Sequence, residues 1–307
     1  MSDQDLGFSL IIPTYARPKQ LGNCLESLTQ LIAPRSGFEI IIVDDGSPES
    51  LEPVVAPFRE KLNLRLLRQE NGGPAKARNT GAAAARGRHL AFTDDDCRPE
   101  PDWLCALERA AEEGPNDLLG GRTVNLLTRE ACASTSQLII DMVYAFFNQN
   151  PGDAQLLASN NMAMPAAIFQ RLNGFDAALY RKAAGEDRDL CTCYRNLGYR
   201  LQFVPQAVIG HAHHLTLWSF WRQHFGYGQA AWIYHRKHAQ VIPKSLQQDA
   251  KLHTQMYRWL PGPLRKLPFW IRVQVLPLLV VWQVANAAGF FYAAFQSRKN
   301  PKPVSDS

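Results

Sequence analysis

The sequence predicts an α/β fold in which a mostly parallel sheet is flanked by helices. The first half of the 307-residue chain alternates short apolar runs with segments of helical spacing, in the order βαβαβαβ. Strands joined by such crossovers lie parallel to one another. Three of the four predicted strands end in polar clusters, and ligands bind such sheets outside the carboxyl ends of the strands. One edge of the sheet is therefore expected to carry the functional site.

Each predicted element has its own local signal. The four apolar runs that predict strands are residues 8–13, 39–43, 63–68 and 89–93. Helices are expected at residues 20–31, where leucines recur at helical spacing, at residues 51–61, and at the alanine-rich residues 75–85. In the less regular second half, we expect strands at residues 118–125 and 200–204 and helices at residues 135–147 and 190–197.

The composition is that of a globular protein, with 46% hydrophobic and 20% charged residues. The six cysteines form no CxxC pair and have no zinc-site spacing, so we interpret them as reduced thiols. A signal peptide is not expected, because residues 1–6 are polar and acidic and the apolar run after them is too short. The chain also lacks the GxxxxGKS or GxxxxGKT segment of a P-loop protein.

The net charge of +5 hides an asymmetry between the two parts of the chain. Residues 222–307 contain 12 Lys or Arg and two acids, whereas residues 1–221 contain 21 Lys or Arg and 26 acids. A basic C-terminal segment indicates an anionic partner, for which nucleic acid and the inner membrane leaflet are both candidates. Residues 273–297 lack any charge and are long enough to cross a bilayer.

Positive charge flanks both ends of this uncharged segment, and Pro277 interrupts it. A single crossing should have ends that differ in charge. We therefore expect a kinked, re-entrant or interfacial element that binds acidic headgroups, and we do not expect nucleic-acid binding. The soluble alternative is a buried C-terminal helix or a dimer contact.

Three consecutive carboxylates, Asp94, Asp95 and Asp96, follow the predicted strand at residues 89–93. They would repel one another unless a cation or a set of hydrogen-bond donors holds them. Hard oxygen ligands at a strand end suit Mg²⁺ or Mn²⁺, and such ions usually accompany a diphosphate. The alternative is a solvated turn with a helix cap.

Two further segments have candidate chemistry. A Gly72-Gly73 turn precedes a predicted helix with Lys76 and Arg78 in its first turn, a typical arrangement for binding phosphate. Glu186 and Asp187 precede another helix, and adjacent carboxylates raise one another's pKa, which suits a general base. On this local evidence alone, capping of that helix is the better-supported interpretation.

These motifs, in their order and at their intervals, resemble family 2 of the glycosyltransferases. The matching segments are residues 11–17, 42–47, 77–81, 92–96, 174–176 and 185–190. The resemblance covers residues 8–235 and implies a GT-A fold with a Rossmann-like nucleotide-binding half at residues 8–125 and an acceptor half at residues 126–235. Residues 236–307 would then form a basic, membrane-associated region.

The resemblance also implies roles for individual residues. Those expected to bind a nucleotide-sugar donor are Pro13, Thr14, Tyr15, Arg17, Asp44, Asp45, Lys76, Arg78, Asn79, Asp94 and Asp95. The metal ligands would be Asp96, Asp94 and His211, with His213 as the second histidine candidate. Asp187 would be the catalytic base, with Glu186 beside it. The acceptor or membrane side would include Asn160, Asn161, Trp218, Arg222 and Gln223.

The expected activity is inverting transfer of a single sugar that depends on Mn²⁺ or Mg²⁺. The donor would be a nucleotide-sugar, UDP-linked, and the acceptor a hydroxyl of a lipid-linked or membrane-borne molecule at the cytoplasmic face of a membrane. One alternative is a catalytically silent nucleotide-sugar-binding protein, against which the set of acids argues. Another is a nucleotidyltransferase, which would need a Gly-rich, Arg-bearing signature near the first strand.

Overall fold

The computed structural model describes residues 6–180 and 185–299, which form two compact units. The sheet unit comprises the described residues of Met1–Leu126, Asn148–Arg181 and Glu186–Ala212. The helical unit comprises those of Leu127–Phe147, Lys182–Gly185 and His213–Ser307. Packing thus groups segments from several parts of the sequence, whereas the expected boundary at residue 235 separates functions and stays a prediction.

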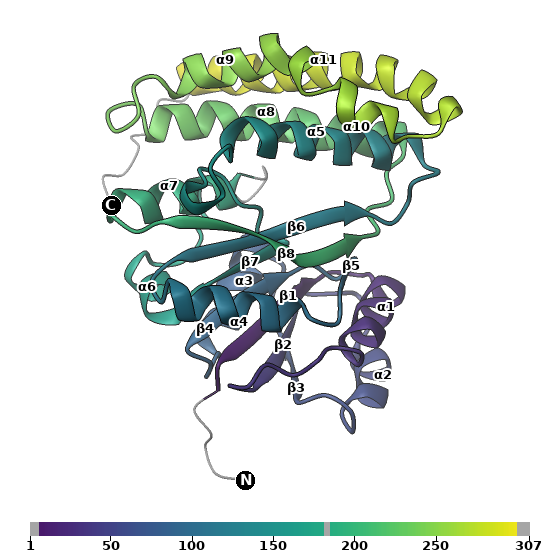
Figure 1. Cartoon of the computed structure of the whole chain (residues 1–307), viewed down its shortest axis with the longest axis vertical. Coiled ribbons are helices and arrows are strands. Elements are labelled where there is room, and N and C mark those ends of the chain that lie inside the picture. Colours follow the sequence, from purple (N-terminus) through teal and green to yellow (C-terminus); the bar gives the residue numbers. More distant parts are fainter. Residues whose placement is uncertain (1–5, 181–184, 300–307) are drawn as a thin grey trace. The chain divides into compact units, whose positions relative to one another are not determined.

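Within the described residues, the sheet unit is built on eight strands in the order β3-β2-β1-β4-β7-β6-β8-β5 (Figure 1). Their bounds are β1 Phe8–Thr14, β2 Phe38–Asp44, β3 Leu64–Arg68, β4 His89–Thr93, β5 Cys97–Pro99, β6 Leu118–Asn125, β7 Asn161–Pro165 and β8 Leu201–His211. β1 pairs in parallel with β2 and β4, and β2 with β3, whereas β7 is antiparallel to β4 and β6. This mixed sheet confirms the predicted α/β class and its parallel first half.

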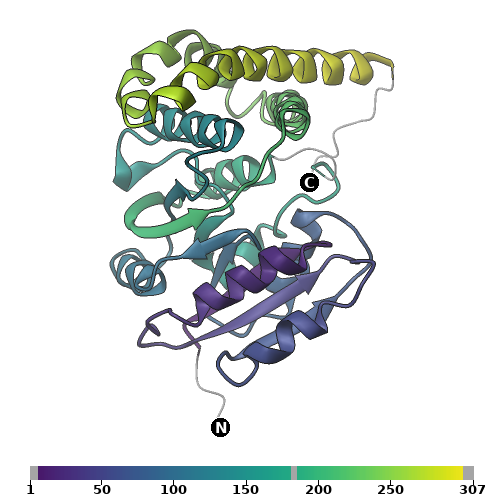
Figure 2. The ribbon, with the colours of Figure 1, turned by 90° about the vertical axis from the view of Figure 1, so that its right-hand side faces the viewer.

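Helices cover both faces of the sheet because successive side chains of a buried strand point in opposite directions. Leu10 of β1 packs in one buried cluster with Leu25 of α1 (Pro18–Leu28). Ile11, the next residue, packs in another cluster with Ala75 of α3 (Pro74–Ala83). Figure 2 shows α1, in purple, lying against the strands of this part of the sheet. The parallel strands therefore end at one edge of a layered core.

The structure corrects several predicted boundaries. The helix expected at residues 51–61 is reduced to α2 (Glu52–Val55) and the 3-10 turn η1 (Ala56–Phe58), because Pro57 cannot continue an α-helical hydrogen-bond ladder. α7 (Glu186–Asn196) begins before the expected residue 190, and β8 runs on to His211. Elements of the sheet unit that the sequence pattern does not anticipate are β5, α4 (Trp103–Glu113), η2 (Pro151–Asp153), β7 and α6 (Ala166–Arg171).

The helical unit is formed by long helices around its own apolar core. Its elements are α5 (Ala131–Phe147), α8 (Leu217–Lys237), α9 (Ser245–Gln255), η3 (Met256–Arg258), α10 (Pro261–Arg265) and α11 (Phe269–Lys299). Met142 of α5, Phe220 of α8 and Trp282 of α11 are buried together. By length and composition alone, α11 could cross a membrane. It contains the whole uncharged segment predicted from the sequence and continues through Pro277.

Two glycines allow α8 and α11 to pack with their backbones in close contact. A Cβ atom at Gly289 would overlap the carbonyl oxygen of Phe225, and one at Gly228 would overlap that of Asn286. The overlap is with backbone atoms, which cannot rotate away as a side chain can. Any side chain at these positions must therefore separate the helices.

Replacing Gly289 by Ala is expected to destabilise the helical unit by about 2 kcal/mol or more, because the helices must move apart around the added methyl group. Gly226→Ala in α8 is the matched control, since a Cβ there meets nothing within 4 Å. The control should be neutral or slightly stabilising, because Ala favours helix over Gly. Urea unfolding measures both variants, and equal effects would argue against the close contact.

His224 of α8 is buried in an aromatic environment without polar contacts. It is 1% exposed, and its ring centroid lies 4.3 Å from that of Phe220 and 6.5 Å from that of Trp282. Neither ring nitrogen has a hydrogen-bond partner among the described residues. Burial, together with the charge of His213, lowers the pKa of His224 to about 4.

Acidification should therefore destabilise the helical unit through His224. Its folded pKa lies below the unfolded value of about 6.5, so the stability present above pH 6.5 falls by about 3 kcal/mol as the pH drops to 4. His224→Phe keeps an aromatic ring but removes the titrating group. The free energy of unfolding of this variant should therefore decrease less than that of the unchanged protein as the pH falls from 7 to 4. Urea unfolding of both proteins at pH 7 and pH 4 measures the difference, and identical pH dependence would exclude this role of His224.

Candidate active site

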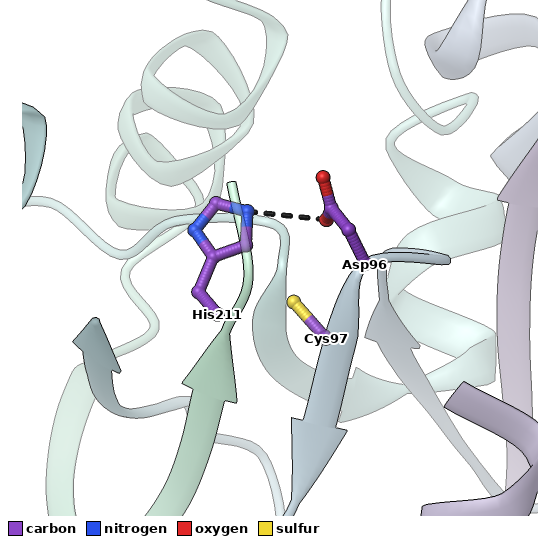
Figure 3. A group of neighbouring side chains, drawn as sticks. All are labelled: Asp96, Cys97 and His211. Carbon is purple, nitrogen blue, oxygen red and sulfur yellow. Dashed lines mark hydrogen bonds and ion pairs between the residues drawn. The ribbon is translucent and has the colours of Figure 1, made fainter. Parts of the chain in front are cut away.

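Asp96, which follows β4, contacts two basic side chains. Its Oδ1 lies 3.1 Å from Nε2 of His211 at the end of β8, and its Oδ2 lies 3.1 Å from Nη1 of Arg17. Figure 3 shows the imidazole of His211 beside the carboxylate of Asp96. The backbone supports this arrangement, because the N–H of Ala212 donates to the carbonyl oxygen of Asp96 over 2.9 Å. Strand pairing thus brings together two side chains far apart in the sequence.

Cys97 lies in the same cluster, where one ligand atom each from Asp96, Cys97 and His211 lies within 4.8 Å of the others (Figure 3). Burial, with the charges of Asp94 and Asp96, raises the pKa of the Cys97 thiol well above its ordinary value. A neutral thiol is a poor ligand for Mg²⁺ or Mn²⁺, which prefer oxygen donors. The carboxylate of Asp96 and the imidazole of His211 therefore fit such a cation better than the thiol does.

Asp95 joins the ends of β4 and β1. Its Oδ2 accepts a hydrogen bond from Oγ1 of Thr14 over 2.7 Å, and its Oδ1 accepts one from Nη1 of Arg17 over 2.9 Å. Burial raises the pKa of Asp95 to about 6, although Arg17 and Thr14 oppose the rise. Asp95 and Thr14 are both buried, so in this structure they support the edge on which a donor would lie.

Arg78 of α3 is buried between two carboxylates, and its side chain is 4% exposed. Its Nη2 donates to Oδ1 of Asp94 over 2.7 Å, and its Nη1 donates to Oε1 of Glu186 over 2.9 Å. Its guanidinium also lies 5.7 Å from the ring centroid of Phe175. Arg78 thus connects the end of β4 with the start of α7, and its expected contact with a donor diphosphate stays a prediction.

Asp187 lies in the first turn of α7 and is partly exposed. Its Oδ1 accepts a hydrogen bond from the N–H of Arg188 over 2.7 Å, and its Oδ2 accepts one from the N–H of Ser159 over 3.4 Å. Desolvation by its surroundings and the charge of Glu186 raise the pKa of Asp187 to about 6. A carboxylate of this kind is mostly ionised at neutral pH and basic enough to accept a proton.

Asp45 organises the glycine turn that the sequence suggests as a phosphate site. Its Oδ1 accepts a hydrogen bond from the N–H of Gly72 over 2.9 Å, and its Oδ2 accepts one from the N–H of Gly73 over 2.8 Å. Gly73 has φ of 88°, a conformation that glycine adopts without strain. The carboxylate of Asp45 therefore accepts hydrogen bonds from two backbone amides, next to the start of α3, that were expected to bind phosphate.

Asp44 and Arg68 form a second contact at this edge, from neighbouring strands. Nη1 of Arg68 lies 3.4 Å from Oδ2 of Asp44, and Oδ1 of Asp44 accepts a hydrogen bond from the N–H of Ser47 over 2.8 Å. Arg68 is not among the site residues predicted from the sequence. Its position at the end of a predicted parallel strand was the available signal.

The expected asparagines have structural contacts. The side chain of Asn79 exchanges two hydrogen bonds with the backbone of Phe175. Asn161 is fully buried: its Nδ2 donates to the carbonyl oxygens of Arg122 and Ala207, and its Oδ1 accepts from Nε1 of Trp103. Both amide hydrogens of Asn161 therefore already have partners, and its expected acceptor-side role stays a prediction.

The other expected site residues differ in their contacts and in their exposure. Nδ2 of Asn160 lies 3.9 Å from Sγ of Cys97. Tyr15 is 48% exposed, Lys76 is exposed, and Pro13 is buried. In the helical unit, Trp218 is 67% exposed, Arg222 is exposed, and Gln223 donates to the hydroxyl of Tyr227. His211, and not His213, is the histidine of the cluster in Figure 3.

Comparison with known proteins identifies the family. Residues 9–153 match the family described as glycosyl transferase family 2. The chain is also 38% identical over 171 residues to the poly(ribitol-phosphate) beta-N-acetylglucosaminyltransferase TarS of Staphylococcus aureus, a match that covers 52% of this chain and 30% of TarS. Residues 9–153 therefore belong to glycosyl transferase family 2.

Solved structures share the fold of this family 2 protein. A mannosyltransferase from Pyrobaculum calidifontis, in complex with GDP-Man and Mn²⁺, aligns with a TM-score of 0.64 and 18% identity over 96% of this chain and 88% of that one. Residues 1–349 of S. aureus TarS, in complex with UDP-GlcNAc, align with a TM-score of 0.55 and 19% identity over 97% and 93% of the two chains. These likenesses confirm the predicted GT-A type of fold. The family 2 chain spans less than half the length of the curated relatives that it matches.

Proposed function

We propose that this family 2 protein is a metal-dependent inverting glycosyltransferase that moves a single sugar from a UDP-linked donor to a hydroxyl group. The observation that carries the proposal is that the sheet unit contains two separate carboxylate sites with different surroundings. Asp96 beside His211 fits a divalent cation, while Asp187 is a separate, partly exposed carboxylate with a pKa of about 6. Displacement of a nucleoside diphosphate by a hydroxyl needs one site of each kind.

In the proposed reaction, Asp187 takes the proton of the acceptor hydroxyl while the hydroxyl oxygen forms a bond to C1 of the sugar. The bond from C1 to the β-phosphate oxygen breaks on the opposite face, so the configuration at C1 inverts and the diphosphate leaves with the electron pair. Asp96, His211 and Asp94 would hold Mn²⁺ or Mg²⁺, which would neutralise charge on the diphosphate. The exposed side chains of Tyr15 and Lys76 are available to contact the donor.

The names of the relatives guide the choice of donor. TarS, named for transfer of N-acetylglucosamine and solved with UDP-GlcNAc, is 38% identical to this chain over the 171 matched residues. We therefore propose a uracil nucleotide. We also propose a lipid-linked or membrane-borne acceptor at the cytoplasmic face of a membrane, supported by the apolar helix α11 and the basic C-terminal region.

A screen of nucleotide-sugars tests the reaction class. In the presence of Mn²⁺ or Mg²⁺, a UDP-sugar should raise the thermal midpoint of the full chain and be hydrolysed slowly without acceptor. EDTA should remove the hydrolysis, because charge on the leaving diphosphate is then not neutralised. Binding without hydrolysis of any donor would favour a silent nucleotide-sugar-binding protein. No response to any donor would overturn the proposal.

A further inference from the structure

The outer face of α11 carries a continuous apolar stripe. Its members are between 51% and 69% exposed, and they are Phe269, Val273, Leu276, Val280, Val284, Phe291 and Phe295. Spacings of three, four and seven residues place these side chains on one side of a helix. At 1.5 Å per residue, the stripe is about 39 Å long. An exposed apolar surface of this extent marks an interaction site.

The opposite face of α11 is committed to the helical unit. Val275, Trp282 and Ala285 are buried there, and Gly289 packs against the backbone of α8. Oε1 of Gln283 lies 2.8 Å from Nδ1 of His253 in α9. Figure 2 shows α11, in yellow, at the edge of this unit. If α11 crossed a bilayer, it would have to lose these contacts and expose polar side chains to hydrocarbon.

The charged residues near the stripe indicate which kind of partner it binds. Residues 213–299 contain 11 Lys or Arg and a single acid, Asp249. Arg265 and Lys266, both exposed, precede the stripe, and exposed Arg298 follows it. Positive charge at both ends fits a helix that lies along an anionic surface, with both ends on the same side. If a second copy of the chain docked on the stripe instead, the basic residues that flank the two stripes would come close together and repel one another.

We propose that α11 docks the protein on an anionic lipid bilayer as an in-plane helix, with the stripe inserted at the boundary between headgroups and acyl chains. This inference deepens the membrane part of the proposed function but does not rest on the transfer chemistry. Hydrolysis of a soluble donor can therefore succeed where vesicle binding fails, and the reverse result is equally distinguishable.

Sedimentation of the full chain with vesicles tests the docking surface. The protein should bind phosphatidylglycerol vesicles, bind phosphatidylcholine vesicles weakly, and lose part of its affinity at high salt. Val280→Glu with Val284→Glu should weaken binding about tenfold or more, because two charges enter the stripe. The control is Ile32→Glu with Leu197→Glu, two exposed apolar residues of the sheet unit, which should change binding little. Equal loss in both pairs, or no vesicle binding, would overturn the proposal.

The depth of insertion distinguishes an in-plane from a spanning helix. Tryptophan is introduced singly at Val273, Val280 and Phe291, and its fluorescence is compared with that of the parent protein. Lipids brominated near the headgroup should quench all three positions alike. Strong quenching of only the Val280 position, by bromine near the chain ends, would show a spanning helix and overturn the proposal. A concentration-dependent dimer that forms without lipid and is lost in the Val280→Glu, Val284→Glu pair would assign the stripe to a second copy.

Discussion

Replacing Asp187 by Asn is expected to lower sugar transfer about a thousandfold while leaving donor binding nearly unchanged. Asn preserves the shape of the side chain but cannot accept the proton of the acceptor hydroxyl. Donor affinity should persist because Asp187 contacts the backbone of Arg188 and Ser159 and is separate from the Asp96 cluster. Single-turnover transfer measures the first quantity, and titration with the UDP-sugar measures the second.

The pH profile provides an independent reading of the same carboxylate. Because the pKa of Asp187 is raised from 3.8 to about 6, its basic form is lost as the pH falls below 6. Transfer by the unchanged protein should therefore rise with pH through about 6 and then level off. Asp102→Asn, at an exposed residue that makes no side-chain capping hydrogen bond with α4, is the matched control and should behave as the unchanged protein does. Retention of most activity by Asp187→Asn would assign the base elsewhere.

Replacing Asp96 by Asn is expected to weaken the apparent affinity for Mn²⁺ about a hundredfold or more, and to reduce transfer accordingly at limiting metal. The substitution removes the negative charge that faces His211 and Arg17 but keeps the side-chain volume. Titration of donor hydrolysis with Mn²⁺ gives the apparent affinity. Excess metal should restore part of the activity, which a merely unfolded protein would not show.

Cys97→Ala tests which members of the cluster in Figure 3 bind metal. The thiol is buried and its pKa is well above the ordinary value, so it should contribute to packing and not to binding of a hard cation. We expect slightly lower thermal stability and an unchanged apparent affinity for Mn²⁺. An equal loss of metal affinity in Cys97→Ala and Asp96→Asn would identify the thiol as a ligand, and a softer metal would then fit the site better.

The parallel half of the fold could be predicted because strands buried on both faces consist of consecutive apolar residues, which are recognisable in the sequence. β1 (Phe8–Thr14) and β4 (His89–Thr93) lie at the expected residues 8–13 and 89–93. β7 could not be predicted in this way, because its five residues, Asn161–Pro165, carry no periodic signal of their own. Its place between β4 and β6 depends on pairing with residues about seventy positions earlier, such as Thr93 with Asn161. That pairing is a property of the assembled sheet.

The sequence can suggest where a candidate site lies but not how its side chains pair. The strand-end rule selects the region of Asp44 and Asp96, whose role in binding stays a prediction. It cannot show that Arg78 contacts a carboxylate 108 residues away, or that Asp45 holds the amides of the glycine turn. For Asp187, the two interpretations are compatible: it lies in the first turn of a helix, as capping predicts, and its pKa is raised, as a general base requires.

The balance of charge among the residues that meet at the strand ends bears on the order of ligand binding. Arg17 and Arg78 form ion pairs with acidic side chains of this region. The members of this acidic set are Asp94, Asp95, Asp96, Glu186 and Asp187. Carboxylates gathered in one region oppose the approach of a free diphosphate. For the proposed transfer, we therefore expect the donor to enter as its metal complex or after the metal, so that the cation would assist entry of the donor as well as departure of the diphosphate.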